Sequence, residues 1–408
     1  MADPQERNLR LYQRFFPLSR ASFYGPVFFL YFSEHFSLDR VLALQSIYYL
    51  SVFVIEIPSG YLSDRVGRVL TLRLSALSYS LSFLLYVIAG DHFLLFAAAQ
   101  IAFALGFAIQ SGTDASFHYD TLVGLGRTSE FAGREARVHR DAYIVGAATA
   151  VLGGLGGAID LRFAYGLGLV AAGVMVVISW RMTEPPRSAG GYTSHGLIGQ
   201  LGACLVHLRT PALAWIFGYA VLMVILEHLP YEFSQPYVAF LLGEEATDVH
   251  RTPIATGLLN AVFRLVAAFA AARAAFLLLR FGPARTLLGA TSLQTLLIAA
   301  MALTIHPAVL GLLLFRSAYA AISQVVINTT VTPRVPQEHR ATYLSLHSMA
   351  GRLGYGVVLA MLGAASQGES PDPGTIQQLL GWGSALALAG LVILGVTRRM
   401  APKNDPTP

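Results

Sequence analysis

Long apolar runs separated by short polar turns recur along the whole chain, and they constrain its fold more than any other feature. Two consecutive examples are "LQSIYYLSVFVIEIP" and "LSALSYSLSFLLYVIAG", which begin at residues 44 and 74. A bilayer core requires about 20 predominantly apolar residues in each spanning helix. The strands of a transmembrane β-barrel would alternate polar and apolar residues, and these runs do not. The pattern therefore predicts an all-α membrane protein.

The charge content supports this class. Only 12% of the 408 residues are charged and 55% are hydrophobic, whereas soluble domains are about 25% charged. The net charge is +5, but most Arg residues fall in short loops between apolar runs. That distribution is typical of membrane topology and argues against nucleic acid as a partner.

Twelve membrane spans are predicted, with ends uncertain by several residues. A Pro-, Ser- and Gly-containing linker separates six spans from six. We therefore expect an N-terminal six-helix bundle (1–181), a linker (182–210) and a C-terminal six-helix bundle with a short tail (211–408). The spans lie at about 15–36, 40–61, 69–90, 92–119, 138–159, 161–181, 211–241, 253–280, 284–304, 307–331, 339–364 and 375–397.

The Arg and Lys residues in loops and at span ends predict the orientation of the spans. Twenty of them fall on the side of the two termini and the linker, and three fall on the opposite side: Arg40, Arg162 and Arg251. Because loops rich in Arg and Lys stay in the cytoplasm, both termini are expected there. The predicted location is the cytoplasmic (inner) membrane, crossed many times.

A charged turn, "GYLSDRVGRVLTLR", lies between the second and third spans. A weaker copy, "LRFGPARTLL", lies between the eighth and ninth, so that Gly67 corresponds to Gly282. A turn repeated at the same place in each half indicates two related bundles, as in transporters built from internal repeats.

This turn resembles the signature loop of the major facilitator superfamily, in which Gly60, Asp64, Arg65, Gly67 and Arg68 match the pattern. Val69 replaces the usual second basic residue. The resemblance implies a conformational latch and alternating access between two six-helix bundles. The alternative is a plain cytoplasmic loop, which would require the Arg residues but neither the aspartate nor the glycines.

The resemblance also implies the contacts of this latch. Asp64 would face the amino end of span eleven, near Arg340, and Arg68 would pair with Asp120. A helix N-terminus carries unpaired N–H groups and about half a positive charge, which a carboxylate satisfies.

Ionisable residues inside spans are costly and usually face a cavity, a partner or a proton path. In the N-terminal half, Asp114 and His118 lie one turn apart on one face of span four. They are candidates for proton coupling or substrate binding. The alternative is a solvated helix end.

Span seven holds the strongest cluster, "VILEHLPYEFSQPYVAF". Glu227 and Glu232 lie within an apolar run that two prolines interrupt, and broken helices mark transporter sites. Tyr231 is a candidate substrate contact. Glu227 is the first candidate for the coupling carboxylate, with Glu232 and Asp114 as alternatives. The alternative is that this end of the span reaches the outer aqueous surface, where a carboxylate stays solvated.

Arg264 and Arg316 lie near the middle of spans eight and ten, where an Arg requires a counter-ion or a wet cavity. Pairing between helices would explain one of them. The excess of Arg over Glu in this half hints at an anionic or zwitterionic ligand.

These features together predict a secondary active transporter for a small organic solute. A phosphate-binding loop is absent from the sequence, so ATP is not the expected energy source. Proton-coupled efflux is the first hypothesis, and proton-coupled uptake of an anionic or zwitterionic metabolite is the second. A non-transporting receptor or scaffold is the alternative class. An enzyme, a metal or another cofactor is not expected, and the chain is predicted to be a monomer in the lipid bilayer.

Overall fold

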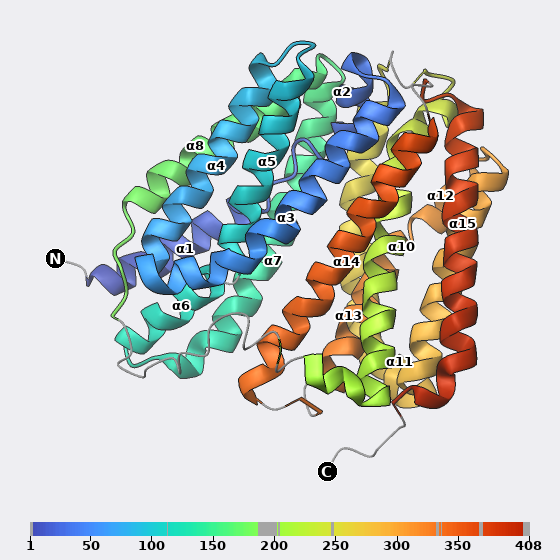
Figure 1. Ribbon diagram of the computed structural model, residues 1–408. Coiled ribbons are helices and arrows are strands. Elements are labelled where there is room, and N and C mark those ends of the chain that lie inside the picture. The colour runs from blue at the N-terminus through green and yellow to red at the C-terminus, as the bar shows by residue number, and fades with distance from the viewer. Residues whose placement is uncertain are drawn as a thin grey trace. The chain divides into compact units, whose positions relative to one another are not determined.

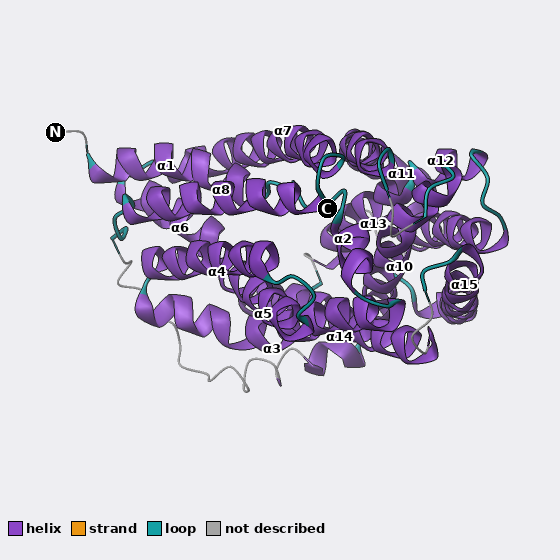
Figure 2. Ribbon diagram, turned by 90° about the horizontal axis from the view of Figure 1, so that it is seen from above, coloured by secondary structure: helices purple, strands orange, loops and turns teal. Residues whose placement is uncertain are grey.

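The computed structural model describes residues 3–111, 113–186, 202, 205–245, 249–331, 334–335, 337–366 and 370–402. Within these ranges, the side chains of 57–65, 132–133, 136, 275, 337–342 and 344–345 are not described. The described chain is built from helices (Figures 1 and 2). It forms two compact units, unit 1 (1–36, 43–194 and 249–261) and unit 2 (37–42, 195–248 and 262–408).

Most predicted spans correspond to helices. The helices of the first half are α1 (Pro4–Ser19), α2 (Phe28–His35), α3 (Leu38–Val66), α4 (Arg68–Ile88), α5 (Phe93–Gln110), α6 (Thr113–Gly124), α7 (Phe131–Gly157) and α8 (Leu161–Trp180). Those of the second half are α10 (Pro211–Leu241), α11 (Thr252–Leu303), α12 (Ala308–Leu313), α13 (Arg316–Val331), α14 (Gln337–Ser366) and α15 (Pro373–Val396). Short 3₁₀ turns occupy Thr128–Glu130, His207–Arg209 and Thr397–Met400.

Ten helical segments of the described residues are long and apolar enough to cross a membrane. They confirm a multi-pass membrane protein, while the count of twelve spans stays a prediction. The two predicted spans that fall outside the ten are 15–36 and 138–159. The second corresponds to α7, whose first turns carry charged side chains and whose last turns are rich in glycine.

The predicted span at 15–36 is not one continuous helix. Helix α1 ends at Ser19 and α2 begins at Phe28. Pro26 lies in the break, and proline both lacks a backbone N–H and disfavours helix at the residue before it. Side chains from other helices satisfy the exposed backbone, since Ser22 N donates to Thr149 Oγ1 at 2.9 Å and Thr256 Oγ1 donates to the Pro26 carbonyl at 2.8 Å.

The repeated turn has the same backbone in both halves. Gly67 has φ 106° and ψ 154°, and Gly282 has φ 77° and ψ 166°. This region of backbone space is open to glycine almost alone. Gly67 lies between α3 and α4, whereas Gly282 makes a kink within α11.

Within unit 1, α4 packs against α5 and α8, and α1 packs against α6, α7 and α8. Figure 2 shows α1 alongside α7 and α8. Within unit 2, α10 packs against α13, α14 and α15. Helices α1, α4 and α10 are therefore each packed against at least two other helices.

Candidate functional site

The turn at Gly67 is stabilised by the carboxylate of Glu184, which follows α8 in the chain. Glu184 accepts hydrogen bonds from the backbone N–H groups of Arg68 (2.7 Å) and Val69 (2.9 Å), at the first turn of α4. Because Gly67 has no side chain, it cannot supply this cap itself. A Cβ on Gly67 would lie about 2.9 Å from the Glu184 carboxylate, so the glycine also leaves room for the cap.

Arg68 also makes the side-chain contact that the family resemblance implies. Its Nε lies 3.4 Å from Asp120 Oδ2, which joins the first turn of α4 to α6. The latch role of this pair stays a prediction. Gly60, Asp64 and Arg65 lie in the stretch whose side chains are not described, as does Arg340. The predicted contact between Asp64 and the start of α14 is thus outside the described residues.

We expect Glu184→Ala to lower the stability of the protein by about 1–3 kcal/mol, because it leaves two N–H groups at a helix end without their charged acceptor. Thermal unfolding of the purified protein would measure the loss. Glu34→Ala, which removes an exposed carboxylate from α2, is the control. Equal stability of the two variants would contradict the capping role.

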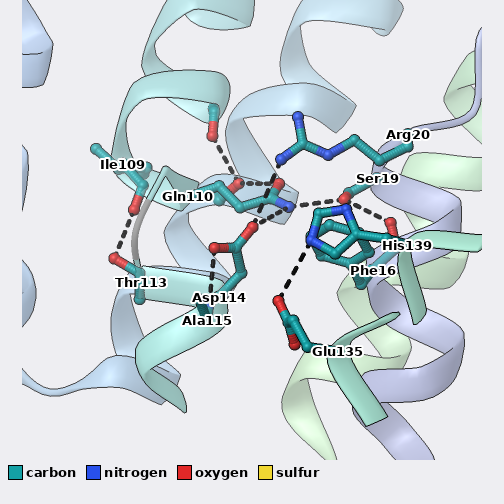
Figure 3. A network of polar contacts seen from close by, with 12 residues as sticks. Phe16, Ser19, Arg20, Ile109, Gln110, Thr113, Asp114, Ala115, Glu135 and His139 are labelled. Carbon is teal, nitrogen blue, oxygen red and sulfur yellow. Dashed lines mark hydrogen bonds and ion pairs between the residues drawn. The ribbon is translucent and has the colours of Figure 1, made fainter. Parts of the chain in front are cut away.

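A buried polar network lies where α1, α5 and α6 meet (Figure 3). Asp114 is only 5% exposed, and its Oδ2 lies 3.6 Å from Arg20 Nη2. Gln110 donates to Ser19 Oγ at 2.6 Å and to Asp114 Oδ2 at 3.4 Å. The Arg20 guanidinium in turn lies 5.1 Å from the centre of the Phe16 ring. Asp114 is therefore paired inside unit 1 and is not the solvated helix end that was its alternative.

A second carboxylate extends this network towards α7. Glu135 Oε2 lies 2.6 Å from Nδ1 of His118, which is 1% exposed, and its Oε1 lies 3.4 Å from Nε2 of His139. Burial alone would raise the pKa of the Glu135 carboxyl, but hydrogen bonds to His118 and His139 lower it to about 2. Glu135 is thus an anion held between two imidazoles.

The surface next to this cluster carries its own ion pairs. Glu130 accepts from Arg127 at 2.6 Å and from Arg134 at 2.8 Å, and Arg127 also contacts Glu6 of α1. These arginines lower the pKa of Glu130 to about 2. Because the pairs are partly exposed to solvent, we expect each to contribute little to stability.

In unit 2, Glu232 is fully buried on α10. Neither carboxylate oxygen has a hydrogen bond of good geometry to a described residue, although the Tyr355 phenol of α14 is near it. Tyr355 Oη donates to the His228 carbonyl at 3.1 Å. An ionised carboxylate in this setting is costly, and the burial of Glu232 argues against the alternative of a solvated carboxylate.

Several other candidate residues of unit 2 lie around Tyr231 and His228. The Arg316 guanidinium carbon lies 5.0 Å from the ring centre of Tyr231 and 4.7 Å from that of Phe263. Glu227, Arg316 and Arg352 are all near enough to act electrostatically on His228. Glu227 and Arg264 are partly buried. Among the described residues, no group of three or more His, Cys, Asp or Glu is placed to hold a metal ion.

Three contacts of unit 1 were not predicted from the sequence. Glu184 follows an apolar run and precedes two prolines, which is a poor signal for a helix cap that lies over a hundred residues away. Glu135 and His139 have the spacing of one helical turn, but the charged start of α7 reads as a solvated face. The partner of Asp114 was equally hidden, because Arg20 lies in the broken first span.

Comparisons with known proteins agree with this fold. The sequence profile of the major facilitator superfamily matches residues 18–359, and no curated protein matches the chain. A crystal structure of a point mutant of the nucleoside transporter NupG has a TM-score of 0.78 at 11% identity, over 96% of this chain and 100% of that one.

Two further structures have the same fold. A bacterial homologue of the human lysosomal transporter Spinster, inward-facing and unoccupied, has a TM-score of 0.69 at 14% identity, over 98% of this chain and 96% of that one. A D-xylose–proton symporter has a TM-score of 0.67 at 14% identity, over 98% of this chain and 97% of that one. Because the family profile covers most of the sequence and the helices have this arrangement, the chain belongs to the major facilitator superfamily and is a membrane transporter, not an enzyme.

Proposed function

We propose that this transporter exports a small organic solute across the cytoplasmic membrane by proton-coupled alternating access. In this proposal, residues 1–181 and 211–408 form two six-helix bundles in twelve spans, and both termini are cytoplasmic. The excess of Arg and Lys on the side of the termini supports the orientation. The repeated glycine turn at Gly67 and Gly282 supports two related bundles.

The pair formed by the buried Asp114 and the partly exposed Arg20 carries the coupling proposal. A carboxylate so little exposed requires either a cation or a proton to neutralise it. When a proton binds Asp114, the attraction for Arg20 is lost and the guanidinium is released. A transporter needs this kind of exchange to link proton movement to a change of conformation.

The pair favours Asp114 over Glu227 as the first coupling candidate, because Glu227 is more exposed and lies among several charged groups. Glu232 is the second candidate. Uptake of an anionic or zwitterionic metabolite is the alternative direction and cargo, supported by Arg264, Arg316 and Arg352 in unit 2. One structurally similar protein is a proton symporter.

The experiment measures flux in proteoliposomes, with a substrate first found by a thermal-shift screen of small organic solutes. We expect Asp114→Asn to abolish accumulation driven by a pH gradient while downhill exchange continues, because the neutral side chain can neither bind a proton nor hold Arg20. Asp141→Asn, which removes a carboxylate from the exposed pair with Arg140 on α7, is the matched control.

The same assay on Glu227→Gln and Glu232→Gln ranks the other carboxylates. Normal uphill transport in Asp114→Asn, with loss in one of these, would move the coupling site to unit 2. Normal uphill transport in all three would contradict proton coupling. Substrate accumulation in the direction of proton flow would indicate uptake, and accumulation in the opposite direction would indicate export.

A further inference from the structure

We propose that an exposed stripe of α11 binds an anionic phospholipid, whose phosphate Arg273 and Arg280 recognise. This arginine stripe consists of Leu265, Phe269, Arg273, Phe276 and Arg280. Successive members are three or four residues apart, so they lie on one face of the helix. The site concerns the lipid around unit 2 and does not depend on which carboxylate couples transport to protons.

The exposure of the arginine stripe is that of a surface in contact with lipid. Leu265, Phe269 and Phe276 are 70%, 62% and 54% exposed, and the adjacent Leu279 is 85% exposed. Both arginines are exposed as well. Large apolar side chains left open along a spanning helix would be costly in water, so in a membrane transporter they contact acyl chains. The two arginines thus lie among side chains that face the bilayer.

This part of the chain offers the arginines no carboxylate. Residues 249–337 contain seven Arg and neither Asp nor Glu, so α11, α12 and α13 are all without an acidic side chain. Neither Arg273 nor Arg280 forms an ion pair with a described residue. An Arg within a span requires a counter-ion or access to water. The phosphate of a lipid is the counter-ion that the surrounding bilayer supplies.

Aromatic rings hold both guanidinium groups close to the helix. The guanidinium carbon of Arg273 lies 5.0 Å from the centre of the Phe269 ring. That of Arg280 lies 6.0 Å from the Phe276 ring and 5.5 Å from the Phe281 ring. A cation–π contact uses a flat face of the guanidinium and leaves its N–H edge open. That edge carries the donors that bind phosphate oxygens in pairs, so the rings order the side chains without occupying their phosphate-binding groups.

The depths of the two arginines suit a single lipid. Arg280 lies two residues before the turn at Gly282, where the helix reaches the headgroups. Arg273 lies about 10 Å further into the membrane by helical rise. Rotation of its long side chain away from Phe269 brings the guanidinium towards the level of the phosphate and ester oxygens. The acyl chains then lie along Phe269 and Leu265. In the proposed orientation this is the cytoplasmic leaflet, whose anionic lipids attract basic side chains.

A small hydrophilic anion is the other ligand that two arginines could attract. Such an anion would have to leave water to reach Arg273, because the residues that flank this arginine on the stripe are apolar and exposed. A phospholipid brings its phosphate to the membrane surface already, and its acyl chains fit beside the same apolar residues. The charge and the apolar flanks together therefore favour an anionic lipid.

The test titrates phosphatidylglycerol, an anionic phospholipid, into the full chain purified in detergent, and native mass spectrometry measures the bound fraction. We expect saturable binding that is tighter than that of phosphatidylcholine, whose headgroup has no net charge. Arg273→Gln and Arg280→Gln should each weaken the binding of phosphatidylglycerol by about fivefold, because each removes one basic group at the membrane surface. Thermal unfolding without added lipid checks that both variants are folded.

Arg399→Gln is the matched control, since it removes an exposed arginine of unit 2 from the turn after α15. This variant should bind phosphatidylglycerol as the wild type does. An equal loss in all three variants would mean a general attraction between a basic protein and anionic lipid, and would overturn the site. Wild-type affinity in both stripe variants would also overturn it. If inorganic phosphate displaces phosphatidylglycerol at an equal concentration, the arginines bind a small anion and the lipid site is wrong.

Discussion

Gly153→Ala is expected to destabilise the protein by about 2 kcal/mol or more, although alanine is the better helix former. A Cβ on Gly153 of α7 would collide with the backbone carbonyl of Phe23, in the break between α1 and α2. A carbonyl in a break held by other helices cannot yield as a flexible side chain would. Helix α7 would then have to move away from the broken first span.

The neighbouring glycines belong to the same close approach. A Cβ on Gly154 would collide with the Pro253 carbonyl at the start of α11, and one on Gly257 of α11 would lie about 2.8 Å from the Ala150 carbonyl. Small residues allow helix backbones to approach closely in membranes, where packing rather than the hydrophobic effect drives association.

Gly156→Ala on the same helix is the control. The nearest atoms to its added Cβ would lie 3.6 Å away, which is an ordinary contact. We therefore expect the free energy of unfolding of this variant to be unchanged or to rise by up to about 1 kcal/mol. Thermal unfolding of both purified variants compares them. A Gly153→Ala protein as stable as Gly156→Ala would show that α7 and the first-span break do not touch as described.

Glu232→Met is expected to stabilise the protein by about 1–3 kcal/mol. The carboxyl of Glu232 is fully buried without a hydrogen bond of good geometry to a described residue. Methionine has a similar length and no polar group to desolvate. A residue that costs stability is retained where it serves function, so the stable variant should also lose pH-gradient-driven transport if Glu232 takes part in coupling.

Glu227→Met separates this effect from a general preference for apolar side chains in α10. Glu227 is less buried and lies among His228, Arg316 and Arg352, so its replacement should leave stability unchanged or lower it. The measurement is again thermal unfolding, paired with flux. A loss of stability in Glu232→Met would mean that the carboxyl has a strong partner and is a structural group.

The sequence alone determined the class of protein and most of its helices. Apolar runs of bilayer length are a local property, and so is the turn around Gly67, whose backbone conformation only glycine readily adopts. For the same reason the corresponding turn at Gly282 was predicted from its residues. The family resemblance, which rests on these local residues, was confirmed over residues 18–359.

Only the tertiary structure decided which charges meet. Arg20 and Asp114 are separated by more than ninety residues, and Glu184 caps a helix that begins at Arg68. The break between α1 and α2 is likewise held by Thr149 and Thr256 from distant helices. Helical periodicity states which side chains share a face, but not which face another helix will cover. The partner of a buried charge therefore depends on packing between segments far apart in the chain, and no local pattern specifies it.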